Sequence, residues 1–335
     1  MHNNKKIFLL CATKQGLDLI NLINKDYKIT CVITPKINKN SPSERISAKN
    51  FCKEKKINFK EIKNYSNLDE IKDYLQNEKI DILICISWQR IIPEWLIKLP
   101  KIACLGSHGS HQGMYLGRGR SPMNWSILAG EKSFTISLFK ITKNDADSGP
   151  EIFNKKIEIS LTDNINDFYI KCHLVLSQMI LKFLKDTKNI NLKKYTGKYR
   201  FLPKITPAES FIDWTRSDID IYNFIRSKTS PYPSAFTYLN KKLLEIKSAQ
   251  LIKVNFNNKY NCGEIAVILS DKRLLISVRN GFLAVEINKK DISRIKEGQI
   301  FKSANFKKQM KTIINRHYKI NPMQKLNQII IKLSK

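Results

Sequence analysis

The residues best suited to chemistry lie in one loop, GSHGSHQGMYLGRGRSPMNW at residues 106–125, which holds two of the five histidines and five of the twelve glycines. His108 ends an apolar run that begins near Lys101. Further along, KNDADSGPEI places Asp147 in a glycine-containing turn. A carboxylate beside an imidazole orients the ring and favours its protonated form, so such a pair could transfer a proton or stabilise an oxyanion.

The two residues can meet only if their segments reach the same edge of a sheet. In the first part of the chain, apolar runs predict buried strands, and segments of helical period predict the helices between them. The predicted strands are 6–12, 28–33, 80–87 and 101–108, and the predicted helices are 16–25, 46–55 and 68–77. This order predicts a Rossmann-like α/β domain with a mostly parallel sheet, whose carboxyl edge would present His108.

Two further features refine this domain. CATKQGLDLI follows the first strand where a GxGxxG phosphate loop would be needed, so nicotinamide redox chemistry loses its main support. After the histidine loop, Ser121 suits a helix N-cap, Pro122 the first turn and Gly130 the position just past the end. A long helix is predicted at 163–185, and His173 within it is interpreted as structural.

The second half of the chain predicts a smaller, mostly β domain like an OB-type barrel. A polar, lysine-rich stretch precedes a short helix at 219–227, and the strand candidates are 235–238, 243–252, 263–269, 274–278 and 282–287. Asn280-Gly281 between the last two is a hairpin signal. We therefore expect a catalytic domain at 1–187, a linker at 188–210, a β-rich domain at 211–290 and a basic tail at 291–335.

The net charge of the chain bears on which partners it could bind. Lys and Arg number 59 against 29 Asp and Glu, a net charge of +30 that would attract RNA or a phosphorylated metabolite. Lysine, asparagine and isoleucine are abundant throughout, so the charge could equally follow from composition. The tail could likewise touch phosphates or form a solvated, partly helical extension, and we favour the extension.

Cysteine spacing and hydropathy exclude several classes. The seven cysteines lie far apart without a CxxC pair, which predicts buried, reduced thiols and no metal site. The apolar stretch at the N-terminus is too short for a secretory signal, and no run of eighteen apolar residues occurs. We expect a cytoplasmic protein without membrane insertion.

The loop and the turn together resemble the formyltetrahydrofolate-dependent formyltransferases, in which an H-x-S-L-L-P-x-x-R-G-x-x-P loop precedes a D-x-G turn. His108 and Ser110 match the H-x-S, Arg118-Gly119 the R-G, Pro122 the final proline, and Asp147 with Gly149 the D-x-G. Downstream, FIDW, YNFIR and PYPSAF at 211–214, 222–226 and 231–236 resemble the entry to the C-terminal domain of methionyl-tRNA and amino-arabinose formyltransferases. The resemblance covers roughly residues 5–290.

The chain departs from this family at two points. The family usually has N-x-H, whose asparagine binds the formyl oxygen, but Gly106 stands there. A backbone N–H, Ser110, His111 or Gln112 could replace that donor, and losing an oxyanion donor elsewhere costs about two to four kcal/mol. The loop is also two residues longer between His108 and Pro122.

The resemblance implies the reaction and the residues that serve it. The cosubstrate would be 10-formyltetrahydrofolate, and an amine would attack its formyl carbon while His108, Asp147 and Ser110 serve catalysis. The loop after the predicted strand 80–87 would hold the cosubstrate through Ser87, Trp88, Gln89 and Arg90, together with Asp145. Core packing for Trp88 and a surface charge for Arg90 remain the alternatives.

The acceptor is narrowed by two segments. The tRNA enzymes carry a basic insertion after the second strand, whereas TPKINKNSPSERI is shorter, and R-S-P-M-N-W resembles the R-x-P-L-N-W of the sugar enzymes. We expect a 4-amino-sugar nucleotide, with Arg118, Arg120 and Asn124 binding it; the arginines could instead tie the loop to carboxylates. Methionyl-tRNA is the alternative acceptor, a catalytically degenerate binding protein is a third reading, and a homodimer is left open.

Overall fold

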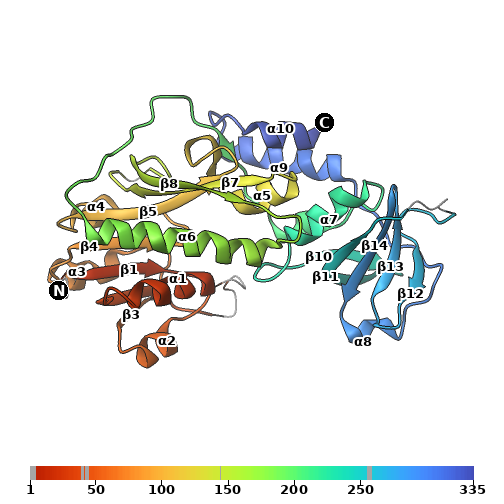
Figure 1. Ribbon diagram of the computed structural model, residues 1–335, viewed down its shortest axis with the longest axis horizontal. Coiled ribbons are helices and arrows are strands. Elements are labelled where there is room, and N and C mark those ends of the chain that lie inside the picture. Colours follow the sequence, from red (N-terminus) through yellow and green to blue (C-terminus); the bar gives the residue numbers. More distant parts are fainter. Residues whose placement is uncertain (1–4, 39–40, 42–44, 144, 255–258) are drawn as a thin grey trace. The chain divides into compact units, whose positions relative to one another are not determined.

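The computed structural model describes residues 5–38, 41, 45–143, 145–254 and 259–335 (Figure 1). The chain divides into two compact units. The first comprises Met1–Arg118, Phe134–Ile157 and Tyr169–Tyr199, and the second Gly119–Ser133, Glu158–Phe168 and Arg200–Lys335. The units interleave along the sequence. The contiguous domains expected from the sequence, with a first boundary near residue 187, stay a prediction.

A seven-stranded sheet forms the centre of the first unit within the described residues, in the order β3-β2-β1-β4-β5-β7-β8. The strands β1 to β5 run parallel, and β7 is antiparallel to β5. Their bounds are β1 Ile7–Cys11, β2 Cys31–Pro35, β3 Asn58–Ile62, β4 Ile82–Ile86, β5 Ala103–Ser110, β7 Ser133–Lys140 and β8 Glu151–Glu158. The mostly parallel α/β sheet predicted from the sequence is confirmed.

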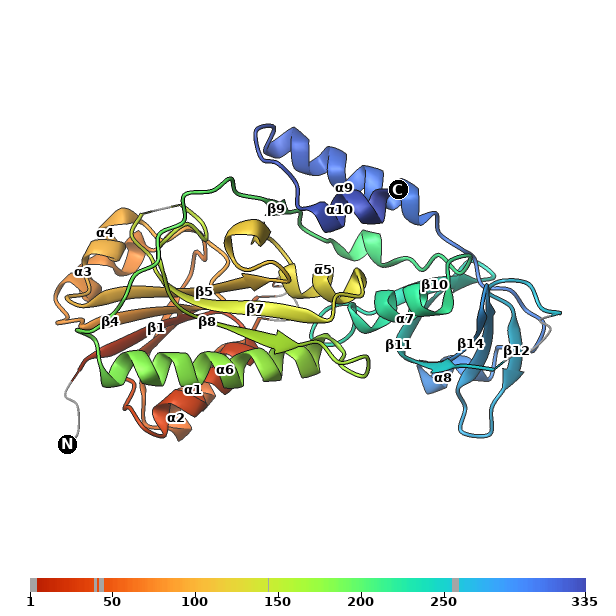
Figure 2. The same ribbon diagram turned by 45° about the horizontal axis from the view of Figure 1, so that its top comes forward.

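The helices of this sheet follow the predicted order. Figure 2 shows α1 and α6 on one face of the sheet and α3 and α4 on the other. The elements are α1 Lys14–Asn24, α2 Lys49–Glu54, α3 Lys72–Gln76, α4 Glu94–Lys98 and α6 Ile165–Lys185, with 3-10 turns at Asp69–Ile71 and Tyr115–Gly117. Thr13 caps α1, because its hydroxyl accepts the N–H of Gly16 at 3.3 Å. His173 on α6 is 6% exposed, and burial lowers its pKa to about 4, in keeping with a structural role.

The second unit is built on an antiparallel sheet, which in the described part of the chain has the order β10-β11-β14-β13-β12. Its strands are β10 Ala235–Leu239, β11 Lys242–Ile252, β12 Ile265–Ile268, β13 Leu274–Val278 and β14 Gly281–Ile287. Residues 299–302 join its two edges, since Ile265 N–H donates to Gln299 O and Lys302 N–H to Tyr238 O. This closure gives the sheet a barrel-like form, as expected.

Helices and a short strand complete this unit. They are α5 Pro122–Leu128, α7 Asp218–Arg226, α8 Lys289–Ile292, α9 Phe306–Ile320, α10 Gln328–Ser334, the 3-10 turn Pro207–Ser210 and the strand β9 Phe201–Leu202; the two-residue strand β6 is Arg118–Gly119. The position of α5 was predicted, but Ser121 adopts a left-handed backbone, with a φ of 55°, and makes no side-chain cap. The N-cap prediction for Ser121 is therefore wrong in its mechanism.

The last thirty or so residues form part of the hydrophobic core of the second unit. Phe306, Met310 and Ile313 on α9, with Leu326 and Ile330 beyond it, pack into the cluster around the buried Trp214. The expected solvated extension is thus partly wrong: the segment is helical, but its apolar face is buried and only its lysine-rich face meets solvent.

All seven cysteines are described, none is in a disulfide, and all except the half-buried Cys262 are buried. Among the described helices, none combines the length and apolarity that a membrane crossing requires.

The packing of α9 predicts the effect of one substitution. Met310→Ala should lower the free energy of unfolding by about 2–5 kcal/mol, because it leaves a cavity in the core. The neighbouring Lys311 is exposed, so Lys311→Ala should change it by less than about 0.5 kcal/mol. Urea unfolding of both variants measures the difference, and equal stabilities would contradict the packing.

Candidate active site

His108 and Asp147 come together in the first unit at the end of β5. The strand β5 pairs with β4 only as far as Gly106, so His108 lies beyond its parallel neighbour at the carboxyl edge of the sheet. Asp147 belongs to the turn between β7 and β8. His108 Nδ1 lies 3.5 Å from Asp147 Oδ1, and the two side chains are 10% and 19% exposed. The convergence predicted from the sequence is present in the structure.

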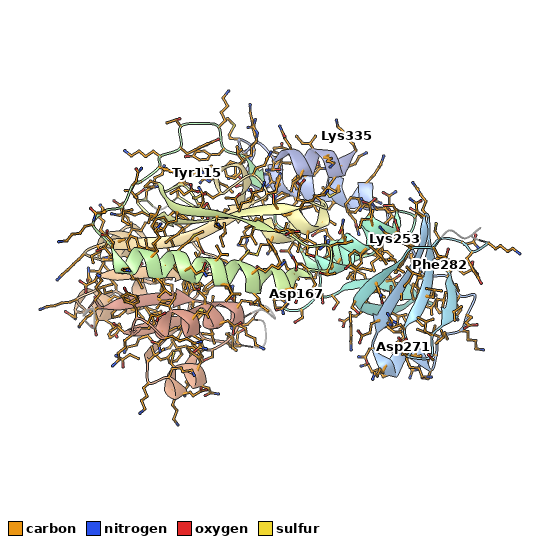
Figure 3. The ribbon with its side chains drawn as sticks, in the orientation of Figure 1. Tyr115, Asp167, Lys253, Asp271, Phe282 and Lys335 are labelled. Atoms are coloured by element: carbon orange, nitrogen blue, oxygen red, sulfur yellow. The ribbon has the colours of Figure 1, made fainter. Side chains whose placement is uncertain are left out.

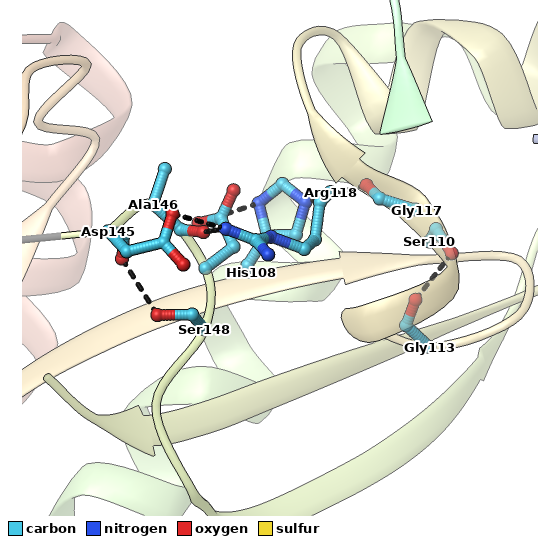
Figure 4. A network of polar contacts seen from close by, with 9 residues as sticks. His108, Ser110, Gly113, Gly117, Arg118, Asp145, Ala146 and Ser148 are labelled. Atoms are coloured by element: carbon cyan, nitrogen blue, oxygen red, sulfur yellow. Dashed lines mark hydrogen bonds and ion pairs between the residues drawn. The ribbon is translucent and has the colours of Figure 1, made fainter. Parts of the chain in front are cut away.

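The second nitrogen of the imidazole also faces an oxygen. His108 Nε2 lies 2.8 Å from the carbonyl oxygen of Gly117, in the loop that follows β5 (Figure 4). A carbonyl can only accept a hydrogen bond, and a carboxylate does the same when ionised. A doubly protonated imidazolium would therefore satisfy both partners, whereas a neutral ring would donate to only one of them.

The turn that carries Asp147 is tight against β7. Asp147 has a left-handed backbone, with a φ of 51°, which is uncommon for a residue other than glycine. A Cβ at Gly149 would lie 1.9 Å from the carbonyl oxygen of Lys140, so no side chain fits there. The D-x-G spacing thus has a steric cause: glycine lets the chain return to β8 close enough to present Asp147.

Arg118 and Asp145 form an ion pair beside this turn. Arg118 is 5% exposed, and its Nη2 lies 2.6 Å from Asp145 Oδ1 and also donates to the carbonyl oxygen of Ala146. Figure 4 shows the guanidinium pointing at both groups. Two roles were expected for Arg118: binding the substrate or tying the loop to a carboxylate. The geometry favours the second role, in which the Asp145 carboxylate is the partner of Arg118.

Ser110 organises the loop after His108. Its hydroxyl donates to the carbonyl oxygen of Gly113 at 2.6 Å and accepts the N–H of Gln112 at 3.1 Å, and the residue is fully buried. These bonds close the turn that contains His111. The geometry gives Ser110 a place in shaping the loop, so its expected catalytic role stays a prediction.

An aromatic ring fills the space beside Gly106. A Cβ at this position would lie 2.6 Å from Phe139 Cζ and 3.2 Å from Ile141 Cδ1. Phe139 is opposite Gly106 in the register of β5 and β7 and is 4% exposed. The missing side chain therefore leaves no vacant space, because Phe139 packs against the backbone of β5.

The loop after β4 gathers the residues expected at the cosubstrate. Ser87 has a left-handed backbone, with a φ of 52°. Trp88 meets Tyr65 edge to face at 4.7 Å and packs against the core, and Gln89 N–H donates to Tyr65 Oη at 2.7 Å. Arg90 lies over the Tyr65 ring and donates to Ser66 Oγ at 3.0 Å. Core packing is thus at least part of the role of Trp88.

Two expected substrate residues belong to the second unit. Asn124 is 6% exposed, and its amide donates to the carbonyl oxygen of Ser227 at 2.7 Å, so this group helps to hold α5 in place. Arg120 N–H donates to Leu202 O at 3.0 Å and its side chain is half-buried. Their expected role in acceptor binding stays a prediction.

Sequence reasoning missed two side chains near the pair. Tyr115 contacts the Asp147 turn, and Phe139 supports it from β7. Tyr115 could have been found as the aromatic residue that lies just before the R-G motif. Nothing in the sequence marks Phe139 apart from its place in an apolar strand. No group of three or more His, Cys, Asp or Glu side chains able to bind a metal occurs among the described residues.

Comparison with known proteins identifies relatives. The family models "Formyl transferase" and "Formyl transferase, C-terminal domain" match residues 6–184 and 204–305. The bifunctional polymyxin resistance protein ArnA of Wigglesworthia glossinidia brevipalpis is 32% identical over 300 residues, which make up 77% of this chain and 45% of that protein. This chain therefore spans less than half of that relative.

Two further relatives match over most of their length. The methionyl-tRNA formyltransferase of Fusobacterium nucleatum is 25% identical over 310 residues, 87% of this chain and 95% of that protein. The N-formyltransferase of Helicobacter canadensis, solved with folinic acid and dTDP-3-aminofucose, has a TM-score of 0.60 at 17% identity and covers 85% of this chain and 100% of its own.

The packing of Phe139 predicts how Gly106 responds to substitution. Gly106→Asn should destabilise the protein by about 1–3 kcal/mol, because the new side chain collides with the buried ring. In a Phe139→Ala background the same change should cost much less. A double-mutant cycle of unfolding free energies measures this coupling. Additive effects of the two substitutions would show that the ring does not exclude a side chain at this position.

Proposed function

This chain belongs to the formyl transferase family of one-carbon group transferases, and we propose that it formylates the primary amine of a 4-amino-sugar nucleotide with 10-formyltetrahydrofolate as the donor. The observation that carries this proposal is the His108–Asp147 pair at the carboxyl edge of the sheet. Its residues match the H-x-S and D-x-G motifs, and both side chains are partly exposed.

The loop after β4 fits the folate. The indole N–H of Trp88 is buried and has no hydrogen-bond partner among the described residues, beside the ring of Tyr65. An unused donor next to an aromatic face suits a pterin, which offers ring nitrogens and a carbonyl oxygen. Ser87, Gln89 and Arg90 are the neighbours of this donor, and Asp145 remains a candidate despite its pairing with Arg118.

The residues of the pair divide the work of amine formylation. When bound, the formyl donor supplies the carbon that a neutral amine attacks; a carbon–nitrogen bond forms, the bond to N10 breaks, and one proton passes from the amine to N10. Asp147 would orient His108 through Nδ1, and Nε2, which lies beside the carbonyl oxygen of Gly117 in this structure, would exchange that partner for the oxygen on which negative charge develops. Asp147 would hold the imidazole and assist the transfer of the proton.

The identity of the acceptor rests on sequence relationships. The R-S-P-M-N-W segment resembles the sugar enzymes, and the Helicobacter canadensis N-formyltransferase of similar fold was solved with dTDP-3-aminofucose. Methionyl-tRNA is the second candidate, because the match to the Fusobacterium enzyme covers 95% of that protein. The outer face of α9, with its exposed lysines, would suit a nucleic acid.

Substitution of the pair predicts a loss of activity. His108→Ala and Asp147→Asn should each lower kcat at least about a hundredfold, because they remove acid–base and oxyanion functions. Thermal unfolding should stay close to that of the wild type. Release of tetrahydrofolate from 10-formyltetrahydrofolate with saturating amine measures kcat. Near wild-type turnover in both variants would rule out the proposed roles.

The acceptor can be decided with a panel of amines. We expect turnover with 4-amino-sugar nucleotides and none with the same nucleotides lacking the amine. Formylation of initiator methionyl-tRNA, with binding that weakens steeply as salt is raised, would favour the second candidate instead. Folate binding without turnover of any amine would indicate a degenerate enzyme.

A further inference from the structure

The first half of the turn 145–149 has little burial of its own to hold it. Asp145 and Ala146 are exposed, and the Ser148 hydroxyl donates to the carbonyl oxygen of Asp145 at 3.0 Å. The left-handed backbone of Asp147 adds strain that surrounding contacts must offset. The distance between Asp147 and His108 therefore depends on contacts from outside the turn.

Those contacts come from the loop that follows His108. Arg118 holds the first half of the turn, through Asp145 Oδ1 and the carbonyl oxygen of Ala146. Tyr115 holds the second half, because its hydroxyl donates to the carbonyl oxygen of Gly149 at 3.0 Å. Asp147 lies between the two contacts. We propose that Tyr115 is a positioning residue that acts with Arg118 as a two-point clamp, keeping Asp147 within reach of His108.

The ring of Tyr115 is itself fixed by the segment that leaves α6. Tyr115 stacks on Tyr195 with centroids 4.5 Å apart and planes 7° from parallel, and its hydroxyl also lies 3.3 Å from the carbonyl oxygen of Lys193. Figure 3 labels Tyr115 near this segment. Burial raises the pKa of the Tyr115 hydroxyl, so it remains a donor at neutral pH.

The same segment supports the other half of the clamp. Lys193 and Glu151 exchange two backbone hydrogen bonds of 2.9 Å, which anchor the segment at the start of β8. Tyr199 then lies 4.5 Å beneath the guanidinium of Arg118. A stretch expected to be a linker therefore backs both residues of the clamp.

The clamp also reaches the second nitrogen of the imidazole. Gly117, whose carbonyl oxygen faces His108 Nε2, lies between Tyr115 and Arg118 in the chain. Both hydrogen-bond partners of His108 thus depend on the same short loop. Loosening Tyr115 should disturb the environment of the imidazole at both of its nitrogens.

Tyr115→Phe tests this role, with Tyr195→Phe as the matched control. Tyr115→Phe keeps the stacked ring and removes only the hydroxyl that reaches Gly149. Tyr195→Phe also keeps the stack, and it removes a hydroxyl that bonds to the carbonyl oxygen of Lys198. We expect kcat of the full chain to fall about tenfold in Tyr115→Phe, with KM for the formyl donor within about twofold of the wild type. The control should match the wild type.

A spectroscopic measurement separates positioning from a general structural effect. With histidines labelled with 15N, the ring signals of His108 can be identified by their absence in His108→Ala. These signals should shift in Tyr115→Phe and remain in place in Tyr195→Phe, while the other four histidines are unaffected. A change in thermal stability alone would not produce this pattern.

This inference rests on the proposed function, and the two can fail separately. Wild-type kcat and unshifted His108 signals in Tyr115→Phe would overturn the clamp, even if His108→Ala is inactive. An active His108→Ala would overturn the proposed roles of the pair whatever Tyr115→Phe does. Equal losses in Tyr115→Phe and Tyr195→Phe would point to a general disturbance of the segment 193–199 and would also overturn the assignment to the Tyr115 hydroxyl.

Discussion

The candidate site depends on how closely the turn 145–149 packs against β7. At Gly149 even a methyl group would overlap the carbonyl oxygen of Lys140, so the backbone of β7 limits where the end of the turn can lie, and the contacts of Tyr115 and Arg118 act within that limit. Such a contact is rigid because no rotamer change can relieve it. His108 is on β5, which pairs with β7, and the turn that carries Asp147 follows β7. The pairing of these two strands therefore fixes His108 relative to the turn.

The packing of Phe139 beside Gly106 follows from the same geometry. Phe139 extends from β7 across the backbone of β5, and its ring also lies 3.1 Å from the place of a Cβ at Gly149. Two glycines therefore admit one aromatic ring between the histidine strand and the aspartate turn. The ring contributes apolar packing beneath the site but no hydrogen-bond donor, so donors for a developing oxyanion must come from His108 or from backbone N–H groups.

Local sequence patterns predicted most of the fold and the centre of the site. Apolar runs gave β1, β2 and β4 because these strands are buried throughout, whereas β3 was missed because most of NFKEI is exposed. His108 and Asp147 were found through their motif. Phe139 and the segment 193–199 could not be found, because their roles depend on contacts between residues far apart in sequence. The tail was misjudged because abundant lysine obscured the apolar face of α9.

The partners of His108 bear on which group handles the proton. An oxygen faces each ring nitrogen, so both nitrogens of His108 have a hydrogen-bond partner in the first unit. Asp147 is the carboxylate next to it, and its side chain is 19% exposed. In the proposed reaction His108 would stabilise the oxyanion and Asp147 would assist proton transfer, so the position of the aspartate turn would be the quantity that the fold must control.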